Sequence, residues 1–573
     1  MVTLTIDDKK IEAEAEETIL QAARSSGIGI PSLCYLEGFN EIGACRLCVV
    51  EVEGMNRLVA SCNTKVQEGM RVHTNTEKVR RARRINTELI LSQHNCECAK
   101  CVRSGNCVLQ KTANDLGILE IAFRKKIKPM RWNTDYPLIR DESKCVKCMR
   151  CIQICSKVQG TKVWDLVGTG GRTTVGVRDG HAIDTAGCVL CGQCITHCPV
   201  GALRARDDTE KVFRAIENKD IITVVQVAPA VRAAWGEALG LNDSFATEKR
   251  MAAALRRLGF DYVFDTNFSA DLTIMEEGSE LVKRMKEGKK SDMPLFTSCC
   301  PGWVRYMKIK YPEYVQHLSS AKSPQQMFGA VAKTYYADLL GVDADRIYSV
   351  SVMPCVAKKY ECGVEAVNDA GSGADVDVSL TTREMAQMIR TTGMDLSALP
   401  EEEFDTPLGT ASGAGVIFGA TGGVMEAALR SAYYLLTGED PDPDAFHAVR
   451  GGFDWREADI TVGETTLHTA VASGLEHARD LIERVERGEA HYDFVEVMAC
   501  PGGCAGGGGQ PIHEGCEYFK SRGEKLYTLD KKNPLRLSYK NPSIQALYND
   551  YLGAPLGEKA HKLLHTDQAD WLL

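Results

Sequence analysis

The sequence contains no long uninterrupted apolar run: nowhere in its 573 residues do about 18 uncharged apolar residues follow one another, as a membrane helix requires. Its first residues, MVTLTIDDKKIEAE, lack the basic start, apolar middle and small-residue cleavage site of a secretion signal. It also lacks a basic surplus, since the net charge is −9, and this argues against a nucleic-acid-binding protein. We therefore expect a cytoplasmic protein with no membrane span and no nucleic-acid partner.

The remaining composition is that of an ordinary globular protein, with 44% hydrophobic and 25% charged residues. A chain of 573 residues exceeds the usual size of one domain, so we expect several domains. Cysteine is the exception, because there are 23 cysteines, sixteen of them before position 200. The cytosol keeps thiols reduced, so this number predicts no disulfide framework and indicates zinc or iron–sulfur sites instead.

The most specific spacing is a run of four cysteines, C-x2-C-x2-C-x3-C, that occurs twice. It is typical of ferredoxins with two 4Fe–4S clusters, in which three neighbouring cysteines hold one cluster and the distant fourth holds the other. Paired zinc ribbons are the alternative, but they have no third two-residue step. The intervening GTGG (168–171) predicts a hairpin turn rather than a phosphate-binding loop. The predicted ligand sets are Cys145, Cys148 and Cys151 with Cys198, and Cys188, Cys191 and Cys194 with Cys155.

A second group of cysteines lies nearer the start of the chain, at Cys34, Cys45, Cys48 and Cys62. These residues stand among short alternating segments such as VTLTI and LCVVEVEG, which are typical of a small β-rich domain. A C-x2-C pair flanked by two more distant cysteines predicts a 2Fe–2S site of ferredoxin type, with zinc as the alternative.

A third group combines His94 with Cys98, Cys101 and Cys107. Its ligand types alone suit a zinc site with three cysteines and one histidine. Its position between a 2Fe–2S region and two 4Fe–4S motifs favours an iron–sulfur cluster with one imidazole ligand instead. Cys96 breaks the spacing of this group and is interpreted as a non-ligand.

Beyond residue 210 the pattern changes to α/β. Helical patterns such as EKRMAAALRRLG and GGVMEAALRSAYYLL alternate with four apolar strand-like runs, IITVVQV, MPLFT, IYSVSV and FVEVMA. In open α/β sheets, sites form beyond the carboxyl ends of strands. The loops that follow these runs include Cys300, Cys355, Cys500 and Cys504, so we expect the four thiols to surround one apolar cavity and to hold a further cluster.

At these residues the sequence resembles the FeFe-hydrogenases. Three stretches carry the resemblance, TSCCPGW (297–303), MPCVAKK (353–359) and EVMACPGGCAGGGGQP (496–511). With the upstream cysteines, the resemblance covers nearly the whole chain. It implies that Cys300, Cys355, Cys500 and Cys504 hold the 4Fe–4S part of an H-cluster. In that cofactor Cys504 bridges to a two-iron subsite that carries carbon monoxide, cyanide and a dithiolate.

The resemblance also implies the fold, a multidomain α/β protein with four domains in order. These are a β-grasp 2Fe–2S ferredoxin-like domain (1–77), a small domain with a His/Cys-ligated 4Fe–4S cluster (78–126), a bacterial ferredoxin-like domain with two 4Fe–4S clusters (127–209) and a large α/β catalytic domain (210–573). The implied cofactors are therefore the H-cluster, three 4Fe–4S clusters and one 2Fe–2S cluster.

A pocket for the two-iron subsite follows from the same resemblance. Lys358 matches the family's basic residue near a cyanide, where a cation favours the anionic ligand. The family often has Ser where this chain has Ala230, so a hydroxyl contact is lost there. The GAG at 413–415 lacks the full dinucleotide fingerprint, and a pocket-lining role around Phe418 is the better interpretation. The implied pocket residues are Pro229, Ala230, Ser323, Pro324, Gln325, Met353, Phe418 and Met498.

Four cysteines lie outside every ligand set: Cys96, Cys299, Cys362 and Cys516. Cys362 and Cys516 are most simply packing residues. Neighbouring residues on an extended chain point in opposite directions, so Cys299 is free to face the two-iron subsite beside a ligand cysteine. Glutamates and an arginine at 277, 280 and 284 share one helix face, a spacing that is usual for surface ion pairs. The family's proton path instead implies a route through Cys299, Glu277, Ser319, Glu280 and Arg284.

The implied activity is that of an iron hydrogenase, which interconverts H2 with protons and electrons and relays the electrons through the amino-terminal clusters. The electron partner is ferredoxin or a flavin-bearing, NAD(P)-linked partner subunit, since the chain has no Rossmann or flavin motif. Maturation proteins are expected to supply the two-iron subsite. Two alternatives stay open: a complex I-type electron-relay subunit, which leaves TSCCPGW unexplained, and an H2 sensor or iron–sulfur assembly relative.

A basic stretch, KVRRARR (78–84), stands out on the acidic chain. A solvated helix face is the commoner origin of such a pattern. The hypothesis that we derive is that Arg80, Arg81 and Arg84 help to dock an acidic ferredoxin or partner subunit by electrostatic attraction.

Overall fold

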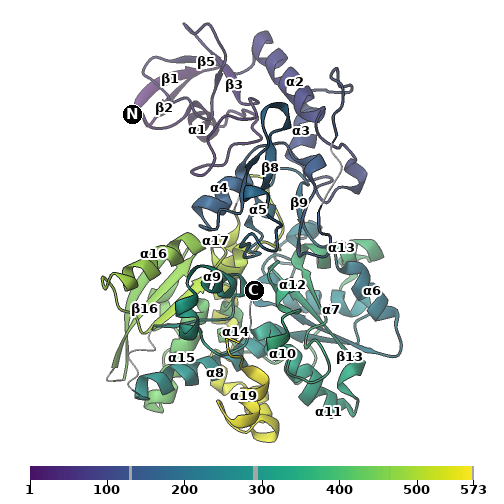
Figure 1. Ribbon diagram of the computed structural model, residues 1–573, viewed down its shortest axis with the longest axis vertical. Coiled ribbons are helices and arrows are strands. Elements are labelled where there is room, and N and C mark those ends of the chain that lie inside the picture. Colours follow the sequence, from purple (N-terminus) through teal and green to yellow (C-terminus); the bar gives the residue numbers. More distant parts are fainter. Residues whose placement is uncertain (128–131, 288–293, 453, 464, 516, 571–573) are drawn as a thin grey trace.

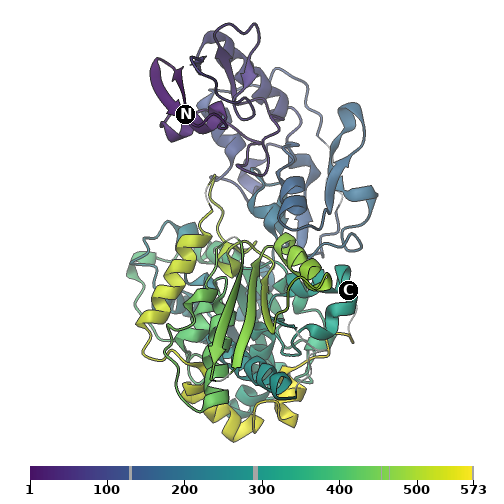
Figure 2. The same cartoon turned by 90° about the vertical axis from the view of Figure 1, so that its left-hand side faces the viewer.

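The computed structural model describes residues 1–127, 132–287, 294–452, 454–463, 465–515 and 517–570. Cys516, expected to be a packing residue, lies outside these ranges. The amino-terminal third of the chain forms one end of the longest axis and the remainder forms the other end (Figures 1 and 2). The expected multidomain architecture with mixed helices and sheets is confirmed. None of the described helices is long and apolar enough to cross a membrane.

The first region is a five-stranded sheet in the order β2-β1-β5-β3-β4, with helix α1 against it. Buried Leu4, Ile6 and Ile11 alternate with polar neighbours, as the strand pattern predicts. Thr18 caps α1 through a reciprocal contact with Gln21. The bounds are β1 Val2–Ile6, β2 Lys9–Ala13, α1 Ile19–Ser25, β3 Val49–Val52, β4 Val59–Ala60 and β5 Arg71–His73.

The next two regions are small and built around cysteine loops. The predicted hairpin is confirmed, because β7 and β8 pair in antiparallel register across residues 168–173. Gly168 has a positive φ of +78°, and a Cβ there would lie 2.8 Å from the Arg172 carbonyl oxygen, so glycine is required at this turn. The bounds are α2 Glu77–Leu91, α3 Val108–Asp115, β6 Leu138–Arg140, α4 Arg150–Lys157, β7 Trp164–Val167, β8 Thr174–Val177, α5 Gln193–Thr196 and β9 Leu203–Ala205.

The large carboxyl-terminal region contains two four-stranded sheets rather than one. The first, β11-β10-β13-β14, is wholly parallel, and the second, β12-β17-β16-β15, is parallel except for the β15–β16 hairpin. The four strand-like runs expected from the sequence are strands, two in each sheet. The bounds are β10 Ile222–Val227, β11 Tyr262–Asp265, β12 Leu295–Phe296, β13 Ile347–Met353, β14 Val378–Thr381, β15 Trp455–Val462, β16 Thr465–Ser473 and β17 Phe494–Met498.

Helices pack on and between these sheets (Figures 1 and 2). The central one, α8 (Thr266–Glu287), is buried over most of its length and packs against α10, α14 and α15. A helix that is apolar or buried nearly all round belongs to the core of a large domain. The other bounds used below are α7 Glu248–Leu258, α9 Pro301–Lys310, α10 Pro324–Val331, α12 Lys358–Glu361, α14 Gly413–Ile417, α15 Gly423–Thr437, α17 Phe519–Lys532 and α19 Glu558–Leu564.

Candidate active site and cluster-binding cysteines

One cavity lies where the loops after β10, β12, β13 and β17 meet, and its volume is about 580 Å³ when the open space at its mouth is included. Its walls are mostly apolar. Seven of the eight pocket residues expected from the sequence border it, as do Cys299 and Lys358. The full lining is Ala228, Pro229, Ala230, Thr266, Cys299, Cys300, Pro301, Pro324, Gln325, Met353, Pro354, Cys355, Lys358, Phe418, Gly419, Met498 and Cys504.

The eighth expected pocket residue, Ser323, is not brought to this cavity. It borders a neighbouring cavity together with Ser298, Lys322 and Glu361. Its hydroxyl donates a hydrogen bond to Glu361 Oε2 over 2.9 Å. Ser323 therefore reaches the site only through that carboxylate.

Three of the four expected cluster thiols, Cys300, Cys355 and Cys504, border the cavity, and Cys500 lies close to them. Cys300 precedes α9, which Pro301 starts, and Cys355 follows β13. Burial raises the pKa of the Cys500 thiol well above its usual range, and the nearby thiols Cys355, Cys300 and Cys504 raise it further. Burial likewise raises the pKa of Cys355 to about 11. Four mutually repelling thiolates in an apolar site fit an iron–sulfur cluster, whose cations stabilise them.

The glycine-rich loop after β17 is explained by backbone packing. A Cβ on Gly507 would lie 2.2 Å from the Pro354 carbonyl oxygen, and a Cβ on Gly508 would lie 2.4 Å from the Cys191 carbonyl oxygen. The loop therefore packs directly on the loop that holds Cys355 and on a loop of the two-cluster region. Any side chain at either glycine would push the ligand loops apart.

Lys358 is fixed by a carboxylate that the sequence interpretation missed. Its Nζ donates to Glu361 Oε2 over 2.7 Å and to the Cys299 carbonyl oxygen over 3.2 Å. Burial alone would lower the pKa of Lys358, but Glu361 outweighs burial and holds it above its ordinary value. The same carboxylate accepts a hydrogen bond from Gln325. The signal was present in the KKYE sequence, since positions i and i+3 share a helix face.

Glu277 is buried on α8 close to Cys299, which borders the cavity, and neither carboxylate oxygen has a hydrogen-bond partner among the described residues. Burial raises the pKa of this carboxyl to about 8, Glu280 raises it as well, and the nearby Ser319 hydroxyl and Ser298 N–H oppose the rise only in part. The group is therefore protonated through neutral pH and can both donate and accept a proton.

The other residues of the expected proton route form a continuous chain of contacts. Ser319 Oγ donates to Glu280 Oε2 over 2.7 Å, and Arg284 pairs with Glu280 Oε1 over 2.6 Å. Glu280 is 8% exposed, so this chain ends near the surface. At the inner end, burial raises the pKa of the Cys299 thiol well above its usual range, Glu277 adds to the rise, and Lys358 opposes it. The thiol is thus kept protonated next to the cavity.

The accessory cysteines also gather in sets. Residues of the first ferredoxin-like set border one cavity and residues of the second set border the next. Cys500 Sγ lies 3.6 Å from the Cys191 carbonyl oxygen, so the second set adjoins the thiols of the catalytic region. In the part of the chain that the structure describes, no three Cys, His, Asp or Glu side chains converge on a position for one metal ion, as they would in a closed zinc site. The two sets are Cys145, Cys148, Cys151 and Cys198, and Cys155, Cys188, Cys191 and Cys194.

In the amino-terminal sheet domain the four cysteines are at most 9% exposed, and the Cys45 N–H points to Cys34 Sγ at 3.5 Å. Cys48 and Cys62 are close enough for one thiol to hydrogen-bond the other, which lowers the pKa of Cys48 to about 7. A buried set of four neighbouring thiols fits a 2Fe–2S cluster.

His94 is 6% exposed and lies three residues after the end of α2, shortly before Cys98, Cys101 and Cys107 in the sequence. Its Nδ1 is 3.0 Å from the Lys144 carbonyl oxygen. Nδ1 can donate to that carbonyl only in the tautomer that leaves Nε2 as the lone-pair nitrogen, which is the usual arrangement behind a metal-bound imidazole. Cys96 is turned to the His94 carbonyl oxygen, 3.3 Å away.

Family models match nearly the whole chain. The model for the iron only hydrogenase large subunit, C-terminal domain, matches residues 221–508. This chain belongs to the iron-only, or FeFe, hydrogenase family. Models for a 2Fe-2S iron-sulfur cluster binding domain, the NADH-ubiquinone oxidoreductase-G iron-sulfur binding region and a 4Fe-4S dicluster domain match residues 1–77, 83–122 and 143–202. The iron hydrogenase small subunit model matches residues 516–569.

Individual relatives agree with this assignment to the hydrogenases. NADP-reducing hydrogenase subunit HndD of Solidesulfovibrio fructosivorans is 47% identical over 99% of this chain and 98% of its own length. Iron hydrogenase 1 of Clostridium pasteurianum is 38% identical over 99% of both chains. A solved structure of apo [FeFe]-hydrogenase HydA1 from Chlamydomonas reinhardtii is 43% identical, with a TM-score of 0.57, and covers 63% of this chain and 98% of that chain.

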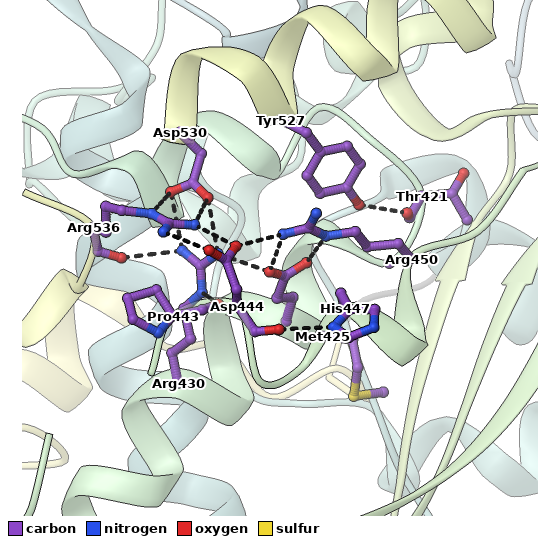
Figure 3. A network of polar contacts seen from close by, with 12 residues as sticks. Thr421, Met425, Arg430, Pro443, Asp444, His447, Arg450, Tyr527, Asp530 and Arg536 are labelled. Atoms are coloured by element: carbon purple, nitrogen blue, oxygen red, sulfur yellow. Dashed lines mark hydrogen bonds and ion pairs between the residues drawn. The ribbon is translucent and has the colours of Figure 1, made fainter. Parts of the chain in front are cut away.

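The carboxyl-terminal part of this hydrogenase is attached through a buried network of charges (Figure 3). Arg430, which is 0% exposed on α15, pairs with Glu426 over 2.7 Å and with Asp530 of α17 over 2.9 Å. Arg450 adds two 2.8 Å bonds to Glu426, and Arg536 pairs with Asp530 over 2.7 Å. The segment that resembles a small subunit is therefore an integral part of the catalytic region.

Proposed function

We propose that this hydrogenase interconverts H2 with protons and electrons at the cavity beyond the ends of β10, β12, β13 and β17. The observation that carries the proposal is that Cys299, Lys358 and three of the four expected cluster thiols border one apolar cavity. The fourth thiol, Cys500, lies close to those three. Cys300, Cys355, Cys500 and Cys504 would hold the H-cluster, which supplies the redox chemistry on H2 when it is bound. Apolar walls exclude water, and the Lys358 ammonium, held by Glu361, provides a fixed positive charge for an anionic ligand.

Protons would pass between the cavity and the surface through the side chains of α8 and the loop after β12. Cys299 holds a proton beside the cavity, and Glu277 receives and returns it. Ser319, Glu280 and Arg284 continue the route outward. The support is the unpartnered, protonatable Glu277 at one end and the hydrogen-bonded Ser319–Glu280–Arg284 chain at the other.

Electrons would pass through one 2Fe–2S cluster and three 4Fe–4S clusters on the accessory ligand sets. Ferredoxin or an NAD(P)-linked, flavin-bearing subunit would exchange them with the chain, since its relative HndD is named an NADP-reducing hydrogenase subunit. Maturation proteins would supply the two-iron subsite. The many cysteines without a predicted disulfide framework favour a reducing compartment, and we propose the cytoplasm.

The test is infrared spectroscopy of the purified, anaerobically prepared protein, together with its iron content and an H2 assay with a viologen dye. The proposal predicts carbonyl and cyanide stretches and H2-dependent dye reduction. Iron–sulfur assembly proteins are also similar to this chain, such as cytosolic Fe-S cluster assembly factor narfl of Xenopus tropicalis, 32% identical over 66% of this chain and 82% of its own. Full iron content without these stretches, after supply of the two-iron subsite, would favour that function instead.

A further inference from the structure

Exposed apolar side chains are concentrated in one small part of the hydrogenase. Thirteen large hydrophobic residues are exposed in the described chain, and six of them fall between positions 85 and 127. Leu119 is 95% exposed, which is the highest value among the thirteen. Apolar patches of this kind mark protein interaction sites. The six residues are Ile85, Leu89, Val102, Leu119, Phe123 and Ile127.

The same part of the chain is strongly basic beside an acidic neighbour. Residues 78–126 contain eleven Lys and Arg against four Asp and Glu, a net charge of +7. Residues 1–77 contain seven Lys and Arg against twelve Asp and Glu, a net charge of −5. The two adjoining regions therefore have opposite charge, on a chain whose overall charge is −9. A charged partner would distinguish between them.

Five exposed cations of the basic region have no acidic partner among the described residues: Arg80, Arg81, Arg124, Lys125 and Lys126. Other cations there are neutralised within the chain, as Arg84 is by Glu88 over 3.0 Å. The Lys126 N–H donates to the Ser92 carbonyl oxygen over 2.9 Å, which places the segment of Arg124, Lys125 and Lys126 at the carboxyl end of α2. Arg81, Ile85 and Leu89 stand four residues apart on that helix and so share one of its faces. The patch thus combines apolar surface with uncompensated positive charge.

The patch also lies close to a cluster site. Cys98, Cys101 and Cys107 are partly exposed, whereas the four cysteines of the sheet domain are buried. Lys125 is near enough to Cys96 to affect the pKa of that thiol. A redox protein bound at the patch would therefore lie closer to the His94 ligand set than a partner bound on the acidic sheet domain.

We propose that this patch, formed by Arg81, Ile85, Leu89, Leu119, Phe123, Arg124, Lys125, Lys126 and Ile127, docks an acidic iron–sulfur electron-carrier protein. The docking face is then the basic region around the His94 ligand set and not the sheet domain at the tip of the molecule. The acidic sheet domain repels the same carrier and fixes the orientation of docking. The inference rests on the proposed electron relay and adds the place where electrons enter or leave it.

The test measures binding of a purified acidic ferredoxin with two 4Fe–4S clusters to the full chain, by calorimetry at about 0.01 M and about 1 M salt, where the Debye length is about 30 Å and about 3 Å. Arg81→Glu with Lys125→Glu should weaken binding at low salt at least tenfold, and high salt should abolish the difference. Phe123→Ser should weaken binding at both salt concentrations. The matched control is Lys9→Glu with Lys10→Glu, the same charge change on exposed lysines of the sheet domain.

The control should bind the ferredoxin within about twofold of the parent. The inference is overturned if the control loses as much affinity as the Arg81 and Lys125 variant, or if neither variant loses any. Viologen-linked H2 oxidation, which needs no docked protein, should be equal in all variants. If the parent protein itself showed no viologen-linked H2 oxidation, the proposed function would be contradicted, but the measured ferredoxin binding would still stand. The two failures are therefore distinguishable.

Discussion

Two carboxyl groups in the catalytic region are fully buried, but one has hydrogen-bond partners and the other has none among the described residues. Glu426 on α15 and Glu277 on α8 are both 0% exposed, and their helices pack against each other. Glu426 accepts hydrogen bonds from Arg430 and from Arg450. Glu277 has no hydrogen-bond partner for either oxygen among the described residues, and burial raises its pKa to about 8.

The difference separates a structural use of buried charge from a chemical one. A buried carboxylate that is paired with guanidinium groups is costly to remove, because the cations would be left unpaired. A buried carboxyl without a cation near it exchanges protons near neutral pH. Of these two carboxylates, Glu277 is the one near Cys299, which borders the cavity, and it is therefore the one to which we assign the proposed proton transfer.

The largest effect is expected at the residue that joins Glu277 to the cavity. Cys299→Ser should lose nearly all H2 production and uptake, because a thiol has a reference pKa of about 8.5 and a serine hydroxyl is a far weaker acid. Iron content and carbonyl stretches should match the parent. Loss of the metal centre would make Cys299 structural, and normal turnover would mean that protons enter elsewhere.

Glu277→Gln removes the protonatable group and keeps its shape. Turnover should fall by about 100-fold or more, as expected for a positioned acid–base group. The stability of the variant should rise relative to the parent as the pH increases from about 4 to about 8. The folded-state pKa of about 8 lies above the unfolded value of about 4.3, so the parent loses stability across that window and the amide does not. Thermal unfolding at several pH values checks the sign, and a constant difference between variant and parent would contradict it.

Glu426→Gln should give the opposite pattern. It leaves Arg430 and Arg450 with one carboxylate fewer, and we expect a loss of about 3 kcal/mol in the free energy of unfolding. Specific turnover of the folded protein should change little. Urea unfolding measures the loss, and Glu489→Gln, which breaks an exposed pair with Arg487, is the matched control with an expected loss below about 1 kcal/mol. Equal losses in both would remove the distinction between the buried and the exposed pair.

The smallest effect is expected outside the catalytic region. His94→Ala should slow electron passage to a protein acceptor while the carbonyl and cyanide spectrum stays unchanged, because a neutral imidazole gives its cluster a potential unlike that of its all-cysteine neighbours. Cys96→Ala, two positions along the chain, is the control and should match the parent. If His94→Ala also matched the parent with every electron donor, His94 would be no ligand on an obligatory route.

The ligand sets could be predicted from the sequence because their spacing is local. Cys145, Cys148 and Cys151 lie within seven consecutive residues. The surroundings of Ser319 could not be predicted, because the carboxyl-terminal segment holds its loop: the Thr566 N–H donates to the Ser320 carbonyl oxygen over 2.8 Å. No pattern in the sequence joins positions 320 and 566.

The same reason explains the other differences between expectation and structure. Strand periodicity identified the four runs but not their division between two sheets, because sheet membership depends on pairing between distant strands. Glu361 was overlooked although its spacing from Lys358 is helical, since four residues are too few for a periodic signal. Burial of Glu277 without a partner is likewise a property of packing, and the sequence spacing alone predicted a surface ion pair.

The most direct test of the central role of Glu277 is the turnover of the double variant Cys299→Ser with Glu277→Gln beside both single variants, with infrared spectra and iron content recorded for each. If the two residues serve one proton route, turnover of the double variant should lie within about threefold of turnover of the less active single variant. A route that one substitution has already interrupted cannot be interrupted again by the second. Two losses that multiply, with all spectra intact, would show that Glu277 and Cys299 act independently and would contradict this account.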